Sequence, residues 1–334
     1  MQSNDLLLEL NAARAARGAQ RRHFMKMAGG ATAAIAGASL LSACDNDDDG
    51  DVVVTPTPTP TPSPVATTTD QNILNFALNL EYLEAQFYAF AVTGQSIPGN
   101  LLSGTGAPGA PTGGRAVNFT DPTVRAFARE IAADEQAHVA FLRAQLGSVA
   151  VAQPAIDLSP AGAFSAAARA AGLIGAGQTF DPYASDENFL LAAFIFEDVG
   201  VTAYKGAAPL ITSKTYLEAA AGILAAEAYH AGLIRTTLYR KGVATPALID
   251  GTESISNARD SLDGTSGAGA DRDQGVRPTG DVANIVPTDE FGIAFSRSTQ
   301  QTLNIAFLTA TSTDRGGFFP AGINGAFRTS GANA

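Results

Sequence analysis

The chain has 334 residues, of which 46% are hydrophobic and 16% are charged, so it can bury a large core and is not a disordered protein. Its formal net charge is −11. The first 43 residues carry a charge of +3, which leaves −14 on the remainder. Because so acidic a surface repels phosphate backbones, we expect no nucleic-acid partner.

The first 43 residues have the features of an export signal. The pair Arg21 and Arg22, with Phe two positions later and then Lys, resembles the twin-arginine export signal. The weakly apolar run that follows, residues 28–41, is too short to span a bilayer core of about 30 Å. Cys44 is the only cysteine, and with the preceding Leu-Ser-Ala it resembles a bacterial lipobox. We therefore expect a lipoprotein exported by the twin-arginine route and anchored to the membrane through Cys44, in the periplasm or at the cell surface.

A low-complexity tether comes next. Residues 44–69 are first acidic and then carry proline at every second position. Such proline fixes φ and removes backbone donors, which predicts an extended polyproline spacer without a core. The chain then divides into the signal at 1–43, the tether, a helical domain at 70–242, and an irregular C-terminal extension at 243–334 packed on that domain.

Hydrophobic residues at helical spacing predict four long helices in the helical domain. Asp70 is the expected cap of the first, and Asp121, followed by proline at the first helical position, caps the second. A short crossover helix separates the two pairs. This pattern defines an all-α four-helix bundle with one long connection. The expected ranges are 70–92, 121–146, 159–173 (the crossover), 185–205 and 213–242.

The extension after residue 243 has a different composition. Gly, Thr, Asp and Ser dominate as far as residue 280, which predicts irregular structure. A short helix is expected at 298–308, with serine at its start and Gln301 three residues on. The aromatic, glycine-rich segment 316–320 completes an irregular cap folded onto the bundle.

Two Glu-x-x-His motifs carry the candidate chemistry: Glu135 with His138, and Glu227 with His230. The two histidines are the only ones outside the first 43 residues, and glutamate is scarce, with 11 residues in the chain. Two such motifs are therefore not expected by chance. Residues i and i+3 share a helix face, so each motif directs a carboxylate and an imidazole at one point in the bundle core.

The other two long helices repeat in the same way. Glu81 and Glu197 are each followed seven residues later by a tyrosine, Tyr88 or Tyr204. Arginines at 143 and 235 each lie eight residues after the glutamate of a Glu-x-x-His motif, and we expect them to form structural ion pairs. Because the order of these residues is preserved, the domain is interpreted as a duplicated helical hairpin.

Together the four helices supply four carboxylates and two imidazoles, the ligand set of di-iron and di-manganese carboxylate bundles. Two divalent ions neutralise four carboxylates, whose burial without partners would cost several kcal/mol each. The sequence therefore predicts a site for two divalent metal ions, Fe or Mn. The predicted ligands are Glu81, Glu135, His138, Glu197, Glu227 and His230.

The domain resembles the ferritin-like superfamily, which includes rubrerythrins, bacterioferritins and manganese catalases. Within it, residues 75–84 and the ending 316–320 are most similar to the desiccation-related, ferritin-like family, over residues 70–334. The resemblance implies the same six ligands, and it places Tyr88 where ferritins have a tyrosine near the site.

Four more side chains are candidates for the surroundings of the metals. Glu84, one turn after the first predicted ligand, is either a seventh ligand or a solvated or hydrogen-bonded side chain, and its counterpart in the second half is Gly200. Asp134 either accepts a hydrogen bond from a ligating histidine or is exposed. Tyr88 and Tyr204 either hydrogen-bond to ligating carboxylates or pack by their rings alone.

Oxygen and imidazole ligands with open positions suit Fe and Mn, and this favours a redox enzyme acting on peroxide, oxygen or Fe(II) in stress protection. It would be a ferroxidase, peroxidase or catalase. The alternative is a non-catalytic, metal-stabilised, desiccation-protective surface lipoprotein. A mineral-storing cage is disfavoured because the tether and the extension would obstruct a closed shell. The choice of metal, and whether the chain forms a homodimer, stay open.

The substitution Cys44→Ala tests the lipid anchor. We expect the wild-type protein to sediment with membranes and the variant to be released, because buried acyl chains contribute about 0.8 kcal/mol per CH₂ to membrane binding. Cell fractionation and mass spectrometry of the mature N-terminal peptide provide the measurement. A soluble wild-type protein with an unmodified Cys44 would contradict the prediction.

Overall fold

The computed structural model describes residues 67–264 and 272–333. The predicted export signal, Cys44 and nearly all of the tether lie outside the described residues, so these assignments stay predictions. Within the described part, every helix is too short or too polar to cross a membrane.

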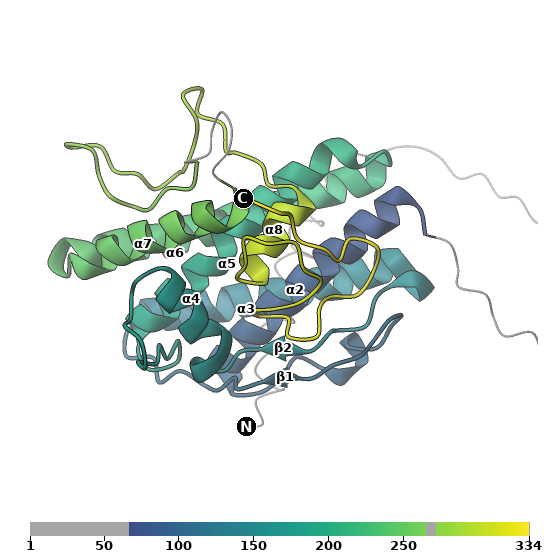
Figure 1. Cartoon of the computed structure of the whole chain (residues 1–334), viewed down its shortest axis with the longest axis horizontal. Helices are drawn as coiled ribbons and strands as arrows, with labels where there is room; N and C mark the ends of the chain where they lie inside the picture. Colours follow the sequence, from purple (N-terminus) through teal and green to yellow (C-terminus); the bar gives the residue numbers. More distant parts are fainter. Residues whose placement is uncertain (1–66, 265–271, 334) are drawn as a thin grey trace, which may run out of the picture. The chain divides into compact units, whose positions relative to one another are not determined.

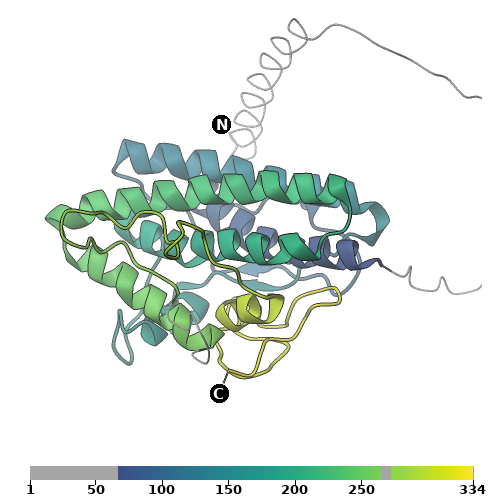
Figure 2. The same ribbon diagram turned by 90° about the horizontal axis from the view of Figure 1, so that it is seen from above.

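Four long helices form the bundle (Figure 1): α2 (Thr69–Thr93), α3 (Pro122–Leu146), α5 (Asp186–Ala207) and α6 (Lys214–Ala244). Helix α2 packs chiefly against α3, and α5 packs chiefly against α6, so each half of the domain is a helical hairpin. Figure 2 shows α6 running alongside α5 and α3. The predicted all-α bundle is confirmed, and the four predicted long helices agree with the structure to within two residues at each end.

Local hydrogen bonds decide where α2 begins and ends. The hydroxyl of Thr68 accepts a bond from the backbone N–H of Gln71, and the side-chain oxygen of Gln71 accepts one from the backbone N–H of Thr68. Thr68 is therefore the cap, rather than the predicted Asp70. The carboxylate of Asp70 instead accepts the backbone N–H of Ser213 at the start of α6, at 2.8 Å. Gly94, with φ of 73°, ends the helix in the left-handed conformation that glycine favours.

Residues 94–121 connect α2 to α3 within the first hairpin, and residues 147–185 cross from that hairpin to the second. They include the two-residue strands β1 (Pro111–Thr112) and β2 (Ile156–Asp157), which pair in parallel. A Cβ atom at Gly109 would lie 2.1 Å from the backbone nitrogen of Ala155, so glycine is what lets the two segments run side by side. The predicted crossover helix is shorter than expected: a π-helical turn at Pro160–Phe164 leads into α4 (Ser165–Ala170).

The prediction of irregular structure after residue 243 is wrong for α7 (Ala247–Asp263). The buried face of this helix includes Thr252, Ser256 and Arg259 beside its apolar side chains, so hydrophobic periodicity alone does not reveal it. The short helix expected near residue 298 is present as α8 (Thr299–Ala306), with a capping box. It lies against α7 and α5 (Figure 1).

A buried ion-pair network joins the extension to the bundle. Asp198 of α5 accepts bonds from Arg235 of α6 at 2.8 Å and from Arg259 of α7 at 2.9 Å. Arg259 also pairs with Asp273, which in turn pairs with Arg297. These side chains are nearly inaccessible to solvent, and a charge so deeply buried is tolerated only with such partners.

Removal of Arg297 should destabilise the fold strongly, because it leaves Asp263 and Asp273 buried without their shared cation. Breaking a buried ion pair from one side costs about 3–5 kcal/mol, so Arg297→Met should lower the free energy of unfolding by about that amount in a urea titration. The control is Arg277→Met, because the ion pair of Arg277 with Asp250 is exposed and its loss should change nothing measurable. Equal stability of the two variants would contradict a structural role for the network.

Candidate metal centre

The six predicted ligands converge in the middle of the bundle. One glutamate comes from each of α2 and α5, and a Glu-x-x-His motif comes from each of α3 and α6. Each of the six residues is at most 7% exposed, so the cluster is sealed from bulk solvent by the helices that carry it. The residues brought together are Glu81, Glu135, His138, Glu197, Glu227 and His230.

Their ligand atoms form two overlapping groups of four, and within each group these atoms lie within 4.8 Å of one another. Two glutamates, one from each Glu-x-x-His motif, belong to both groups and therefore lie between two positions. Each position is completed by one further glutamate and one histidine. This arrangement is compatible with a di-metal site. The groups are Glu81, Glu135, His138 and Glu227, and Glu135, Glu197, Glu227 and His230.

The distances between these atoms suit shared coordination. His230 Nδ1 lies 3.1 Å from Glu135 Oε1 and 3.5 Å from Glu197 Oε2. His138 Nδ1 lies 3.2 Å from Glu81 Oε2 and 3.5 Å from Glu135 Oε2. Two atoms bound to one ion by bonds of about 2.1 Å are about 3.0–3.4 Å apart in octahedral or tetrahedral geometry. The imidazoles and carboxylates are therefore spaced as ligands are.

Several buried polar atoms of the cluster lack a hydrogen bond among the described residues. They are both carboxylate oxygens of Glu135 and of Glu227, Oε2 of Glu197, and Nδ1 of His230. Such atoms carry a large desolvation cost when unpaired. A divalent cation accepts a lone pair from each of them, and hard oxygen and imidazole donors are those that Fe and Mn prefer. The residues present thus fit a metal site.

Burial and mutual repulsion perturb the acidity of the cluster. Burial raises the pKa of Glu81 to about 7, although the nearby His138 opposes the shift. Burial, and then the charges of neighbouring carboxylates such as Glu135, raise the pKa of Glu227 well above its ordinary value. Burial would lower the pKa of His138, but Glu81 and Glu135 outweigh it and raise that pKa to about 11. Burial would likewise raise the pKa of Glu135, but the attraction of His138 lowers it.

The two predicted tyrosines contact ligands across the bundle. Tyr88 of α2 donates a hydrogen bond to Glu197 of α5, and Tyr204 of α5 donates one to Glu81 of α2. Both phenols therefore hydrogen-bond to carboxylates of predicted ligands, which is the first of the two alternatives left open by the sequence. Each hairpin thus donates a tyrosine hydrogen bond to a glutamate of the other hairpin, as expected if the domain is a duplicated hairpin.

Asp134 takes the role of acceptor for a histidine. Its Oδ2 lies 3.1 Å from His230 Nε2, which leaves Nδ1 of the same ring facing the cluster. An acceptor on one ring nitrogen fixes the tautomer and the orientation of a metal-binding imidazole. The corresponding residue before the second Glu-x-x-His motif is Ala226, so His138 has no equivalent partner there.

Glu84 lies beside the cluster and outside both groups of four. It is 5% exposed, and both alternatives given by the sequence, a seventh ligand or a solvated or hydrogen-bonded side chain, stay predictions. A Cβ atom at Gly200 would lie 2.3 Å from Glu227 Oε2 and 3.4 Å from Glu84 Oε1. Glycine at this position therefore makes room for the carboxylate of Glu227, whereas the contact with Glu84 would be an ordinary one. Burial, and then the charges of Glu135 and Glu197, raise the pKa of Glu84 well above its ordinary value.

Two residues that sequence reasoning missed hold the ligand-bearing helices in place. Arg235 pairs with Asp198, as expected of a structural ion pair, but Arg143 donates a hydrogen bond to the hydroxyl of Tyr82 at 2.6 Å instead. Tyr82 and Asp198 each follow a predicted ligand by one residue. The equal spacing in the two halves was the signal that could have found them.

Comparison with known proteins agrees with this geometry. The ferritin-like domain model matches residues 69–240, more than half of the chain. The chain is 30% identical over 267 residues to the desiccation-related protein PCC13-62 of Craterostigma plantagineum, covering 77% of this chain and 83% of that protein. It is 28% identical over 270 residues to the ferritin-like catalase Nec2 of Nesocodon mauritianus, covering 77% and 84%. No solved structure matches the chain.

The fold and the site together define a class of protein: four-helix bundles whose core contains carboxylates and imidazoles that can bind metal. The chain belongs to the ferritin-like family, and it is homologous to desiccation-related ferritin-like proteins. The family predicted from the residues is confirmed.

Metal binding should release protons and weaken as the pH falls. Glu81, with a pKa of about 7, and His138, with a pKa of about 11, must each lose a proton before they can bind a cation. Affinity for Mn²⁺ should therefore fall about tenfold per pH unit for each proton released, between about pH 8 and pH 6. Calorimetry in buffers of different ionisation enthalpy counts the protons. An affinity independent of pH would contradict the arrangement.

Proposed function

We propose that the chain is a di-metal carboxylate oxidoreductase, with two Fe or Mn ions, that acts on hydrogen peroxide in stress protection. The observation that carries this proposal is the sharing of Glu135 and Glu227 between two groups of four residues. Fe and Mn accept up to about six ligands, so each position keeps room for a small oxidant. Oxygen and Fe(II) are the other substrates that such a centre suits. Peroxide is favoured because a relative that is matched over 84% of its own length is described as a catalase.

The residues of the chain would support this chemistry by holding ligands still. The bound metals would supply the electron transfer. Burial raises the pKa values of the Tyr88 and Tyr204 phenols well above their ordinary value, so both remain hydrogen-bond donors to Glu197 and Glu81 at physiological pH. Asp134 would keep the imidazole of the second motif in its binding orientation. The surrounding bundle excludes bulk water, which strengthens each of these interactions.

A second candidate is a non-catalytic protective protein in which the metals stabilise the bundle. Two observations favour it: a relative is described as desiccation-related, and the unpaired carboxylate oxygens of Glu135 and Glu227 make the fold depend on cations. In either case we propose an exported lipoprotein held by Cys44. A polyproline tether of about 20 residues would then keep the domain up to about 60 Å from the membrane.

Replacement of a shared ligand tests the enzyme proposal. Glu135→Ala should lower the rate of peroxide consumption by about 100-fold or more, because both metal positions lose a ligand. The matched control is Glu130→Ala, an exposed glutamate on the same helix, which should keep the wild-type rate. Metal content and circular dichroism are measured alongside, since loss of a buried ligand can also unfold the bundle.

The protective alternative predicts a different outcome. Chelation of the metals would lower the melting temperature, yet the loaded protein would consume peroxide no faster than free metal. If correctly folded, metal-loaded protein is inert toward both peroxide and Fe(II), the enzyme proposal is wrong and the metal-stabilised bundle remains.

A further inference from the structure

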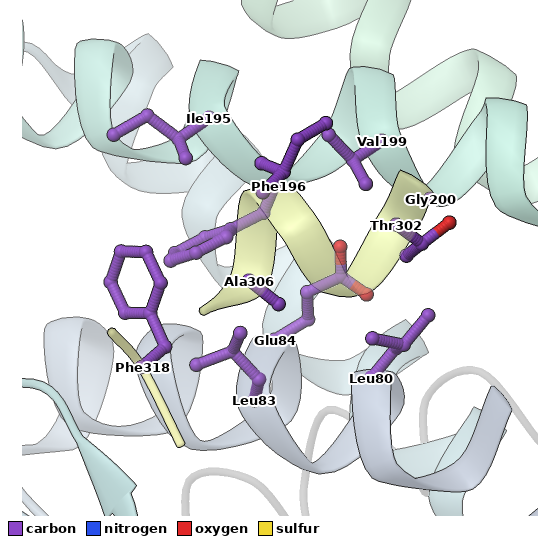
Figure 3. Close-up of a pocket in the computed structure, with 11 residues that line it drawn as sticks. Leu80, Leu83, Glu84, Ile195, Phe196, Val199, Gly200, Thr302, Ala306 and Phe318 are labelled. Atoms are coloured by element: carbon purple, nitrogen blue, oxygen red, sulfur yellow. The ribbon is translucent and has the colours of Figure 1, made fainter. Parts of the chain in front are cut away.

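A small apolar hollow lies beside the metal cluster, between α2, α5 and α8 (Figure 3). Its wall is formed largely by Leu83 of α2, Phe196 and Val199 of α5, and Ala306 of α8. Its volume is about 30 Å³. A single water needs a cavity volume of about 10–15 Å³, so a hollow of this size has room for about two non-hydrogen atoms. It is too small for an organic substrate.

The hollow contains one charged side chain, Glu84, whose carboxyl group points into it (Figure 3). Glu84 is buried and has no hydrogen-bond partner among the described residues, so this group lacks the partner that burial demands. Thr302 of α8 also lines the hollow. Its hydroxyl donates to the backbone oxygen of Ser298 at 3.0 Å, which leaves the hydroxyl oxygen free to accept.

The hollow adjoins the metal cluster at Gly200. This residue lines the hollow, and the position that its Cβ would occupy is 2.3 Å from Oε2 of Glu227, a residue of both candidate groups. Leu80 is the one lining residue that is partly exposed, so the hollow comes nearest to solvent beside it.

We propose that this hollow binds one molecule of hydrogen peroxide next to the metal cluster, with Glu84 and Thr302 as its hydrogen-bonding partners. Peroxide has two non-hydrogen atoms and two O–H donors, which match the size of the hollow and its two polar groups. Dioxygen fits the size and offers no donor to Glu84. The site rests on the proposed function, since it names where that substrate is held.

The proposal also gives the C-terminal extension a role. Thr302, Ala306 and Phe318 come from the extension and close the hollow on the side away from the bundle. The extension therefore supplies one wall of the peroxide-sized hollow beside α2 and α5.

Filling the hollow tests the proposal. Ala306→Leu places three more carbon atoms in it, at a residue that belongs to neither group of candidate ligands, and should lower kcat/KM for peroxide about tenfold or more at unchanged metal content. The matched control is Ala168→Leu. It fills a second apolar hollow of about 20 Å³, on the other side of Ile195 and Ile305, which contains neither Glu84 nor Gly200. If Ala306→Leu and Ala168→Leu have the same kcat/KM for peroxide, the hollow beside Glu84 has no special role and the proposal is wrong.

A second experiment works even if the protein has no activity. Zinc does not change oxidation state, so zinc-loaded crystals can be soaked in hydrogen peroxide without turnover. We expect density for a two-atom molecule hydrogen-bonded to Glu84 in the wild type, and none in crystals of Glu84→Leu. The same water density before and after soaking would overturn the peroxide site. Bound peroxide in a protein that proves inert would instead refute the proposed function and leave the site standing.

Discussion

The structure depends on the burial of four carboxylates and two imidazoles in the core of a helical bundle. Each of these groups is expensive to remove from water, and together they exceed what hydrogen bonds in the bundle can satisfy: both carboxylate oxygens of Glu135 and Glu227 have no such bond among the described residues. The tyrosine hydroxyls and Asp134 satisfy part of the remainder. Cations that bind this donor set would compensate for the burial of its charges. The stability of the fold and the binding of metal therefore depend on each other.

The two hairpins place the same kinds of residue around the buried cluster, and they differ at two positions. Ligands, tyrosines and arginines recur in the same order, and the tyrosine bonds cross between the halves. The symmetry fails at two places beside the cluster: Asp134 corresponds to Ala226, and Glu84 corresponds to Gly200. The first difference gives one histidine an acceptor that the other lacks. The second places Glu84 and Gly200 on the wall of an apolar hollow beside the cluster, so the two groups of candidate ligands have unequal surroundings.

Much of the fold and the cluster could be predicted because their signals are local. The Glu-x-x-His spacing fixes a helix face, and the residue at Asp121 fixes a helix start, without knowledge of distant contacts. Features that depend on tertiary partners were missed. Helix α7 buries Arg259 because this side chain forms ion pairs with Asp198 and Asp273. The position of the Glu227 carboxylate depends on Gly200, which lies on another helix. No periodicity within one segment records such pairings.

The buried network around Asp198 has a consequence for how far the domain extends. The ferritin-like family model ends at residue 240, yet two of the charges that neutralise each other beside the ligand Glu197 come from residues beyond that point. A chain shortened to the family boundary would keep Asp198 and Arg235 but lose Arg259, along with the backbone oxygens of Gln274 and Gly275 that bind the guanidinium of Arg235. The buried network that completes this bundle therefore extends beyond the segment that the family model outlines.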